Sequence, residues 1–457
     1  MPRPTLAGAS MASSPRPALR GLRLAAVTSG AVLLSLTAGA LPAQAAPAAP
    51  PAAVAGHQGR ELDRQALQAS LDAIHQAGMY GTYSAVRDGS SHWRGAAGHA
   101  DVDTGRPVRP GFRHRVGSIT KTFTAVAVLQ QVREGRVDLD APIGRYLPDL
   151  VPGERGRLIT VRMLLNHTSG LGDHIAAAFP GIGQDPGRAL DAGRFRHFEP
   201  EELVRFGLAA PSPVPRGTYG YSNTNYVVLG LLLREVTGQE PEEYITRHVI
   251  RAAGLRHTYF PRTPYLTGPH SRMYESMYGF IDPARDYSVY DMSWGGTAGS
   301  LVSTMEDLNS FYRQLLTGRL LGPAELREMK TTVPAYEAPP GQEPAMRYGL
   351  GIYTTRLSDG RWYWGHDGAV FGAGTMALST EDGRRQVALG INLMKYQHIG
   401  EDGYPQPHAI DEAMLRHVEG ALADAPSPAA TGRAAAPRTL PTAAGPRPFA
   451  APDPLRR

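Results

Sequence analysis

A serine and a lysine lie three residues apart in the stretch VGSITKTF, residues 116–123. If a helix begins near Ser118, positions i and i+3 share one face, so the Ser118 hydroxyl and the Lys121 amine are neighbours. The start of a helix also offers free backbone N–H groups, which favour a developing anion. A nucleophilic serine needs a base, and a lysine whose pKa is lowered by partial burial can serve as one.

Lysine is rare in this chain, with 3 lysines against 44 arginines. Arginine cannot lose its proton, so it can replace a surface lysine but not a catalytic base. The apolar continuation Phe123 to Leu129 indicates a buried helix, where a lysine needs a reason. The alternative for the four-residue pattern by itself is that S-x-x-K occurs by chance on a solvated helix turn.

A second group is the stretch YGYSNTNY, residues 219–226. The hydroxyl of Tyr221 near a lysine can be held as phenolate or pass a proton, and Asn223 offers both a donor and an acceptor to a substrate amide. The alternative is a polar turn in which residues 222–225 cap a helix over 226–236.

A third group is WGHDGA, residues 364–369, at the end of a predicted late strand. Its glycines allow a ligand to approach the backbone closely. An edge strand there could align a peptide-like substrate and lend an N–H group to an oxyanion hole. The alternative is a strand-to-turn junction with an incidental His-Asp pair.

The order S-x-x-K, then Y-x-N about 100 residues later, then H-x-G in the last third, resembles the penicillin-recognising serine hydrolases. Within them it is similar to the secreted D-alanyl-D-alanine carboxypeptidases and their class C β-lactamase and esterase relatives. Supporting stretches are LLNHTSGL (164–171), AGSLVST (298–304) and YGLG (348–351). The resemblance covers about residues 60–423.

The resemblance implies roles for four residues of the first two groups. Ser118 would be the acylated nucleophile, and Lys121 would activate it and accept its proton. Tyr221 would pass that proton to the leaving group and later activate the acceptor. Asn223 would hold the side chain or carbonyl of the acyl donor. No metal or cofactor is implied.

The third group would complete the site. His366 would assist Tyr221 electrostatically, and the backbone N–H groups of Ser118 and Ala369 would form the oxyanion hole. Asp367, Gly368 and Ala369 would contact the substrate.

Two positions depart from the carboxypeptidase pattern. The third motif there usually reads H-T-G, and its threonine helps bind the terminal carboxylate; here Asp367 would repel a carboxylate if it pointed inward. Those enzymes also place a carboxylate-binding arginine just after Y-G-L-G, where this chain has Tyr353. Arg356 could compensate only if the strand register allows it.

The elements that must position these residues form two β-rich regions around a helical middle. The early region has a helix over 62–78 and strands over 82–86 and 92–98; the late region has strands over 348–356, 362–366, 375–379 and 386–392 and a helix over 410–423. Helices are predicted between them over 123–133, 161–165, 201–208 and 226–236. The fold class is therefore α/β (α+β): one antiparallel sheet built from both chain ends, flanked by helices, with an inserted helical lobe.

The predicted division follows this pattern. Residues 61–160 and 286–424 form the catalytic lobe, and residues 161–285 form the helical lobe. Residues 1–45 read as a cleaved secretory signal peptide, with four arginines, an apolar run and the cleavage sequence Ala43-Gln44-Ala45. A linker over 46–60 and a disordered Ala/Pro/Arg tail over 425–457 complete the chain. We expect a secreted, extracellular protein.

The distribution of charge along the chain limits the kinds of partner that we expect the protein to bind. The formal net charge of +5 falls to +1 without the four arginines of the signal, and residues 426–457 carry five arginines against Asp453. The core is then about −3, which disfavours nucleic acid. The tail leaves room for a loose association with an anionic cell wall, and no stable membrane insertion is expected. The 15 histidines show no H-x-x-x-H spacing, which disfavours a metallohydrolase.

Three functions follow from the sequence. The first is a secreted D-Ala-D-Ala carboxypeptidase acting through an acyl-enzyme on a small peptide. The second keeps the chemistry and changes the substrate to a β-lactam, an ester or a D-amino-acid amide. The third is a non-catalytic cell-wall binding protein, which the complete set of site residues argues against.

Overall fold

A nine-stranded antiparallel sheet forms the centre of the computed structural model, which describes residues 62–336, 338, 342–401 and 403–422. Its strand order is β3-β2-β1-β13-β12-β11-β10-β9-β8, so the first strands of the chain pair directly with the last. The register of the β1–β13 pair runs from Thr82 opposite Ile391 to Asp88 opposite Arg385. The predicted sheet built from both chain ends is confirmed.

The strands of this sheet are β1 (Gly81–Asp88), β2 (Ser91–Asp101), β3 (Arg106–Pro107), β8 (Val333–Pro334), β9 (Met346–Tyr348), β10 (Tyr353–Arg356), β11 (Trp362–Val370), β12 (Ala373–Ser379) and β13 (Arg385–Ile391). Two small sheets lie outside it: β14 (Leu393–Met394) with β5 (Tyr274–Glu275) and β6 (Arg285–Asp286), and β4 (His114–Arg115) with β7 (Val302–Ser303).

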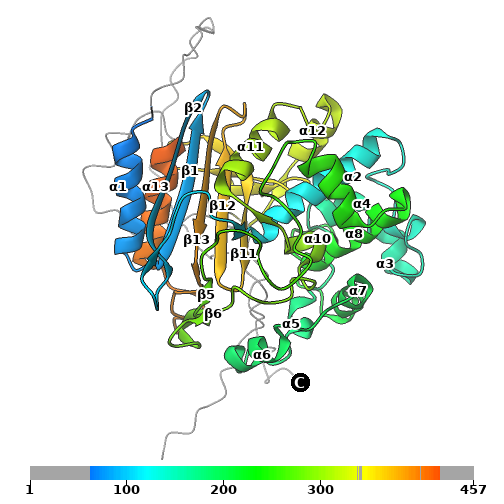
Figure 1. Ribbon diagram of the computed structural model, residues 1–457. Coiled ribbons are helices and arrows are strands. Elements are labelled where there is room, and N and C mark those ends of the chain that lie inside the picture. Colours follow the sequence, from blue (N-terminus) through cyan, green and yellow to red (C-terminus); the bar gives the residue numbers. More distant parts are fainter. Residues whose placement is uncertain (1–61, 337, 339–341, 402, 423–457) are drawn as a thin grey trace, which may run out of the picture.

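Helices cover both faces of the large sheet (Figure 1). On one face α1 (Arg64–Gln76) and α13 (Ala409–Leu422) pack against each other and against β2 and β13. On the other face α11 (Met305–Leu316) packs on β1, β12 and β13. Because both faces are covered, β12 and β13 are buried at every position.

The remaining helices extend from the α11 side of the sheet (Figure 1). They are α2 (Thr120–Arg133), α3 (Gly153–Leu158), α4 (Val161–Leu165), α5 (Ile175–Ala178), α6 (Pro186–Gly193), α7 (Pro200–Ala209), α8 (Asn223–Thr237), α9 (Pro241–Ile245), α10 (Gly296–Gly299) and α12 (Pro323–Lys330). The helices α2 and α8 pack on each other and on α10. Nearly every residue of α2 and α8 before the last turn is buried, as expected of helices that are apolar all round.

The predicted helices and strands are found with small shifts in their ends, except at residues 348–356. That segment is not one strand, because β9 ends at Tyr348 and β10 begins at Tyr353. The backbone between them turns at Gly351, where φ is +73° and a Cβ would lie 2.5 Å from the Cβ of Ala125. Only glycine fits this turn against α2, and apolar patterning does not register that contact.

Several predictions concern residues outside this description. The predicted signal peptide (1–45), linker (46–60) and tail (425–457) lie outside the described residues, and the division into two lobes stays a prediction. Within the described residues, no helix is both long and apolar enough to cross a membrane.

A buried ion pair fixes the turn between β11 and β12. The Lys395 amine donates to Glu275 Oε2 at 3.0 Å, and the Gly372 amide donates to the same oxygen at 3.1 Å. Glu275 Oε1 accepts from the Met277 amide at 3.0 Å. Both charged side chains are removed from water, with 5% exposure for Lys395 and 0% for Glu275. Glu275 therefore links the charge of Lys395 to the turn that follows Ala369.

Glu275→Gln should lower the free energy of unfolding by about 3–5 kcal/mol, because it leaves the Lys395 amine buried without a counter-charge. Urea unfolding followed by circular dichroism measures the change. The matched control is Glu381→Gln, which breaks the exposed pair with Lys330 and should cost less than about 1 kcal/mol. Equal effects of the two substitutions would contradict a structural role for the Glu275–Lys395 pair.

Candidate active site

Ser118 and Lys121 meet at the start of α2. Ser118 lies in the 3₁₀ turn Gly117–Ile119, directly before the helix begins at Thr120, and its side chain is half-buried and accessible. Lys121 follows in the first helical turn and is fully buried. Its amine lies 2.9 Å from Ser118 Oγ. The predicted neighbourhood of these two side chains is present in the structure.

The other contacts of the Lys121 amine determine what it can do. It donates to Asn223 Oδ1 at 2.8 Å and to the Ala298 carbonyl at 2.8 Å. These two oxygens can only accept hydrogen bonds. A neutral lysine has two N–H groups, so they satisfy both of these acceptors and the remaining lone pair is directed at Ser118. In this arrangement Lys121 can take the proton of the Ser118 hydroxyl.

The electrostatic surroundings allow the neutral form of Lys121. Burial lowers the pKa of its amine from 10.5 to about 7, while Asp173 and Asp367 act in the opposite direction through their negative charge. Near neutral pH a large fraction of the protein therefore carries Lys121 as a free base.

Asp173 holds Asn223 in the orientation that this network needs. Its Oδ2 accepts from the Asn223 backbone amide and from Asn223 Nδ2, each at 2.8 Å. With Nδ2 turned to Asp173, Oδ1 faces Lys121. Asn223 begins α8, and the Ser222 side chain before it donates to the Gly172 carbonyl instead of capping the helix. The sequence analysis missed Asp173, whose contact with Asn223 joins segments 50 residues apart.

Tyr221 lies over the same amine. The Lys121 Nζ is 4.9 Å from the centre of the Tyr221 ring. Burial raises the pKa of the Tyr221 phenol well above 10, and the hydrogen bond with Ser118 offsets this only in part. The phenol is therefore protonated at rest. Of the two roles considered for Tyr221, the geometry fits proton transfer and not a standing phenolate.

His167 supports Tyr221 from behind. The two rings are in tilted contact, with centres 4.2 Å apart and an interplanar angle of 30°. His167 Nδ1 accepts from the Ser222 amide at 3.2 Å and from Asn225 Nδ2 at 3.1 Å, which fixes the ring on the segment that carries Tyr221. His167 adopts φ +60°, a left-handed conformation uncommon for a residue with a side chain. From the sequence, His167 was noted only as part of the stretch LLNHTSGL (164–171), and no role was predicted for it.

The predicted electrostatic role of His366 is not supported by its surroundings. Its Nδ1 lies 2.5 Å from the Asp367 carbonyl, which can only accept, so Nε2 takes the hydrogen bond from the Tyr348 hydroxyl at 2.8 Å. Burial lowers the pKa of His366 to about 3, which leaves the ring neutral. The neutral ring contacts the Tyr348 hydroxyl through Nε2, and its Nδ1 lies 3.8 Å from Asp367 Oδ1.

Two glycines bring β11 against the nucleophile turn. A Cβ on Gly117 would lie 2.7 Å from the Ala369 amide nitrogen, and a Cβ on Gly368 would lie 2.9 Å from the Ser118 amide nitrogen and 1.9 Å from the Val116 carbonyl. Side chains at either position would force the two segments apart. The two amides predicted to form an oxyanion hole are thereby held at the contact between β11 and the nucleophile turn.

Asp367 and Tyr353 occupy the positions that departed from the carboxypeptidase pattern. Asp367 is buried in β11, and its charge contributes to the raised pKa values of Tyr353, Tyr219 and Tyr221. Tyr353 is fully buried on β10, opposite Gly365, and its ring centre is 5.4 Å from that of His366. A buried carboxylate and a buried phenol therefore occupy these two positions, beside Tyr221 and His366.

Arg356 does not compensate for Tyr353. It is exposed at the far end of β10, and its Nε donates to the Gly360 carbonyl at 3.1 Å. Because alternate residues of a strand point to opposite faces, the side chains of residues 353 and 356 also leave the strand in opposite directions. The register excludes Arg356 as a substitute for the carboxylate-binding arginine.

Among the described residues, no group of three or more histidine, cysteine or acidic side chains is arranged to hold a metal ion. The chemistry that this site can perform uses its own side chains: a nucleophile, a buried amine base and a protonated phenol.

Comparison with known proteins agrees with this geometry. The beta-lactamase family model matches residues 33–405, and the chain therefore belongs to the beta-lactamase family of serine hydrolases. The putative penicillin-binding protein PbpX of Bacillus subtilis (strain 168) is 27% identical over 331 residues, which cover 72% of this chain and 74% of PbpX.

Two solved structures extend the comparison. A D-stereospecific amidohydrolase from Streptomyces sp. is 37% identical with a TM-score of 0.66, covering 73% of this chain and 95% of that one. The D-amino acid amidase from Ochrobactrum anthropi SV3, complexed with L-phenylalanine amide, is 26% identical with a TM-score of 0.65, covering 78% and 97%. The predicted family and fold class are confirmed.

Lys121→Arg should lower kcat/KM for a simple ester about a thousandfold, because arginine keeps the charge but cannot accept the Ser118 proton. Hydrolysis of p-nitrophenyl acetate measures this. The matched control is Lys330→Arg, the same substitution on a lysine paired with Glu381 at the surface, which should leave kcat/KM within about twofold. A variant Lys121→Arg that keeps full activity would contradict the role of the amine as base.

The pH dependence of ester hydrolysis should follow the Lys121 amine. Because its pKa is lowered to about 7, the amine is charged and inactive as a base below that pH and neutral above it. We expect kcat/KM to reach a plateau above pH 8 and to fall about tenfold per pH unit below pH 6. A profile that keeps rising to pH 10 would contradict the lowered pKa of the amine.

Proposed function

We propose that this protein hydrolyses amide or ester bonds of D-amino-acid derivatives whose leaving group carries no negative charge. One observation carries the proposal: the acidic Asp367 and the neutral Tyr353 occupy the positions where carboxypeptidases of this type bind the terminal carboxylate. A substrate carboxylate entering there would meet a like charge, whereas an amide or ester would not.

The proposed acylation step uses the network around Lys121. Ser118 Oγ attacks the substrate carbonyl as its proton passes to the Lys121 amine, 2.9 Å away. The developing oxyanion is stabilised by the backbone N–H groups of Ser118 and Ala369. The C–N or C–O bond then breaks, and the leaving group takes a proton from Tyr221, which is replaced by the proton held on Lys121.

The second half-reaction reverses these transfers with water. Water gives a proton to the Tyr221 and Lys121 pair and attacks the acyl-enzyme carbonyl. The ester bond to Ser118 breaks, Ser118 regains its proton, and the acid product leaves. Asn223 keeps Lys121 in place throughout, since its Oδ1 accepts from the amine at 2.8 Å. Covalent catalysis of this kind gives ping-pong kinetics.

The preference for the D configuration is proposed from the relatives. The Streptomyces protein, 37% identical over 95% of its length, is described as a D-stereospecific amidohydrolase. The structure from Ochrobactrum anthropi SV3 is described as a D-amino acid amidase. The Streptomyces protein, at 37% identity, is more similar to this chain than the putative penicillin-binding protein PbpX, at 27%, and this supports the amidase.

The D-Ala-D-Ala carboxypeptidase predicted from the motifs is the second candidate. It rests on the S-x-x-K, Y-x-N and H-x-G residues and on the likeness to PbpX. We further propose that the protein is secreted, on the evidence of residues 1–45, and that its arginine-rich tail associates loosely with the cell wall. A class C-like β-lactamase would use the same residues on a substrate that also carries a carboxylate.

A matched pair of peptides tests the proposal. Diacetyl-L-Lys-D-Ala-D-Ala and its C-terminal amide differ only in one negative charge. We expect kcat/KM to be at least about tenfold higher for the amide, because Asp367 opposes the carboxylate. Asp367→Thr should reduce this ratio about tenfold, while the same substitution at the exposed Asp149 should leave it unchanged. D-Phenylalanine amide should be hydrolysed faster than its L-enantiomer.

The opposite preference would contradict the proposal. If the free acid is the better substrate and Asp367→Thr does not alter the ratio of kcat/KM for amide and acid, the protein is a carboxypeptidase and not an amidase. The intact mass of the protein after incubation with penicillin distinguishes a carboxypeptidase from a β-lactamase. A stable Ser118-dependent adduct supports a carboxypeptidase, and rapid turnover of that adduct supports a β-lactamase. If none of these substrates is hydrolysed in a Ser118-dependent way, the protein is a non-catalytic binding protein.

A further inference from the structure

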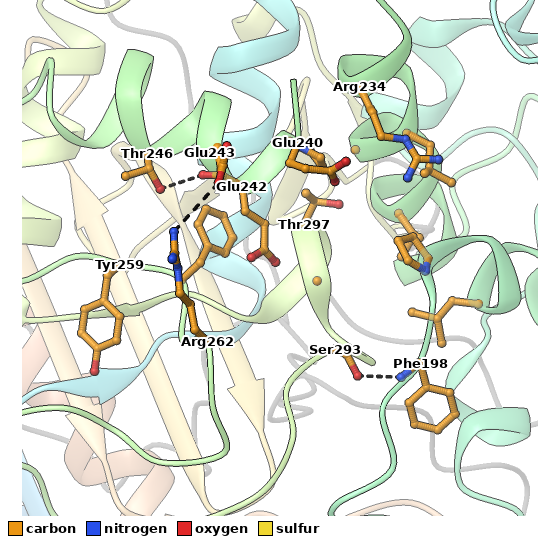
Figure 2. Close-up of a pocket in the computed structure, with 18 of the residues that line it drawn as sticks. Phe198, Arg234, Glu240, Glu242, Glu243, Thr246, Tyr259, Arg262, Ser293 and Thr297 are labelled. Carbon is orange, nitrogen blue, oxygen red and sulfur yellow. Dashed lines mark hydrogen bonds and ion pairs between the residues drawn. The ribbon is translucent and has the colours of Figure 1, made fainter. Parts of the chain in front are cut away.

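A second cavity lies away from Ser118, between α7, α8, α9 and α10 (Figure 2). Its volume is about 590 Å³, within the range of small-molecule sites. Thr297 of α10 lines it, and the carbonyl of the next residue, Ala298, accepts from Lys121. None of the proposed catalytic side chains is among the described residues around the cavity, so α10 separates it from the catalytic site.

One part of the cavity wall is apolar, beside a wall of charged and polar side chains. The side chains of Val227 and Leu231, one helical turn apart on α8, line one side. The other sides are lined by Phe198, which precedes α7, by Leu203 in the first turns of α7, and by Phe260 in the segment after the π-helical turn Thr246–Ile250. Each of these five residues is at most 9% exposed. A ligand with an apolar group would therefore lose water contact on several sides.

One carboxylate points into this apolar space. Figure 2 shows the Glu242 side chain directed between Arg262 and Thr297. Within the described part of the chain no arginine lies within ion-pairing distance of Glu242, whereas Arg234 pairs with Glu201 and Arg262 lies 3.9 Å from Glu243. Arg247 also lines the cavity and donates to Gln239 Oε1 at 3.5 Å, and Arg251 completes the basic part of the wall.

The surroundings of Glu242 favour a cation. Burial and the negative charge of Glu240 raise its pKa to about 7; Arg262, His197 and a hydrogen bond with Ser300 act in the opposite direction. A ligand ammonium beside Glu242 would replace the lost hydration of the carboxylate with a direct ion pair. The chain after α9 continues as a π-helical turn, Thr246–Ile250, a rare conformation that is frequent at functional sites.

We propose that this cavity is a second ligand site that takes a small molecule with one ammonium group and one apolar substituent. Glu242 binds the ammonium, and the apolar residues of α7 and α8 receive the substituent. The proposal does not depend on the reaction at Ser118.

Methyl NMR of the full chain with Ser118→Ala tests this site, because that substitution prevents any acyl transfer to an amine probe. The probes are benzylamine and phenylacetate, which share a ring and differ in charge. We expect benzylamine to produce saturable shifts at the methyls of Val227, Leu231 and Leu203. Phenylacetate should bind at least about tenfold more weakly, because Glu242 repels it.

Two variants and a pH series complete the test. Glu242→Gln should weaken benzylamine binding more than about fivefold, while Glu154→Gln, the same change at an exposed position outside the cavity, should leave it within about twofold. Binding to the wild-type cavity should be about tenfold weaker at pH 6 than at pH 8, since Glu242 is protonated below pH 7 and benzylamine stays charged.

Three results would overturn the proposal: shifts confined to methyls near Ser118 such as those of Val116 and Ile119, tighter binding of phenylacetate than of benzylamine, or no saturable shift with either probe. The methyl shifts and the pH series use the native Glu242, so they decide the matter even if Glu242→Gln fails to fold.

Discussion

The removal of the Lys121 amine from water is the constraint on which the rest of the site depends. A buried ammonium is costly, so the amine titrates near neutral pH instead of near 10.5. Two fixed acceptors, Asn223 Oδ1 and the Ala298 carbonyl, then leave its lone pair for Ser118. The buried helices α2 and α8 and the short α10 supply this environment together. Lys121 lies in the first turn of α2, Asn223 begins α8, and Ala298 lies in α10.

The negative charges around this amine serve two purposes. Asp173 and Asp367 both stabilise the protonated form of Lys121 and so keep its pKa from falling further. The resting site thus holds a base that is strong enough to take a proton and still partly neutral. In the proposed function Asp367 has a second effect, because its charge would oppose a substrate that ends in a carboxylate. The proposal thus attributes base strength and substrate preference to the same carboxylate.

The sequence predicted those features that local patterns encode. Helix α4 over Val161–Leu165 was predicted with its observed ends, and the motif order placed Ser118, Lys121, Tyr221 and Asn223 together. The break between β9 and β10 was missed, because it depends on the contact of Gly351 with α2. The hydrogen bonds of His366 with Tyr348 and of Asp173 with Asn223 were also missed. These contacts join strands and loops whose proximity the one-dimensional pattern does not contain.

The small number of lysines allows the central claim to be measured directly. With ¹³C-labelled lysine the NMR spectrum of the protein contains signals from only three side chains, at positions 121, 330 and 395, and Lys121→Arg identifies the relevant one. The burial of Lys121 predicts a titration midpoint of about 7 for its amine. A midpoint close to the ordinary value of 10.5 would show that the amine is not available as a base at neutral pH and would contradict the account.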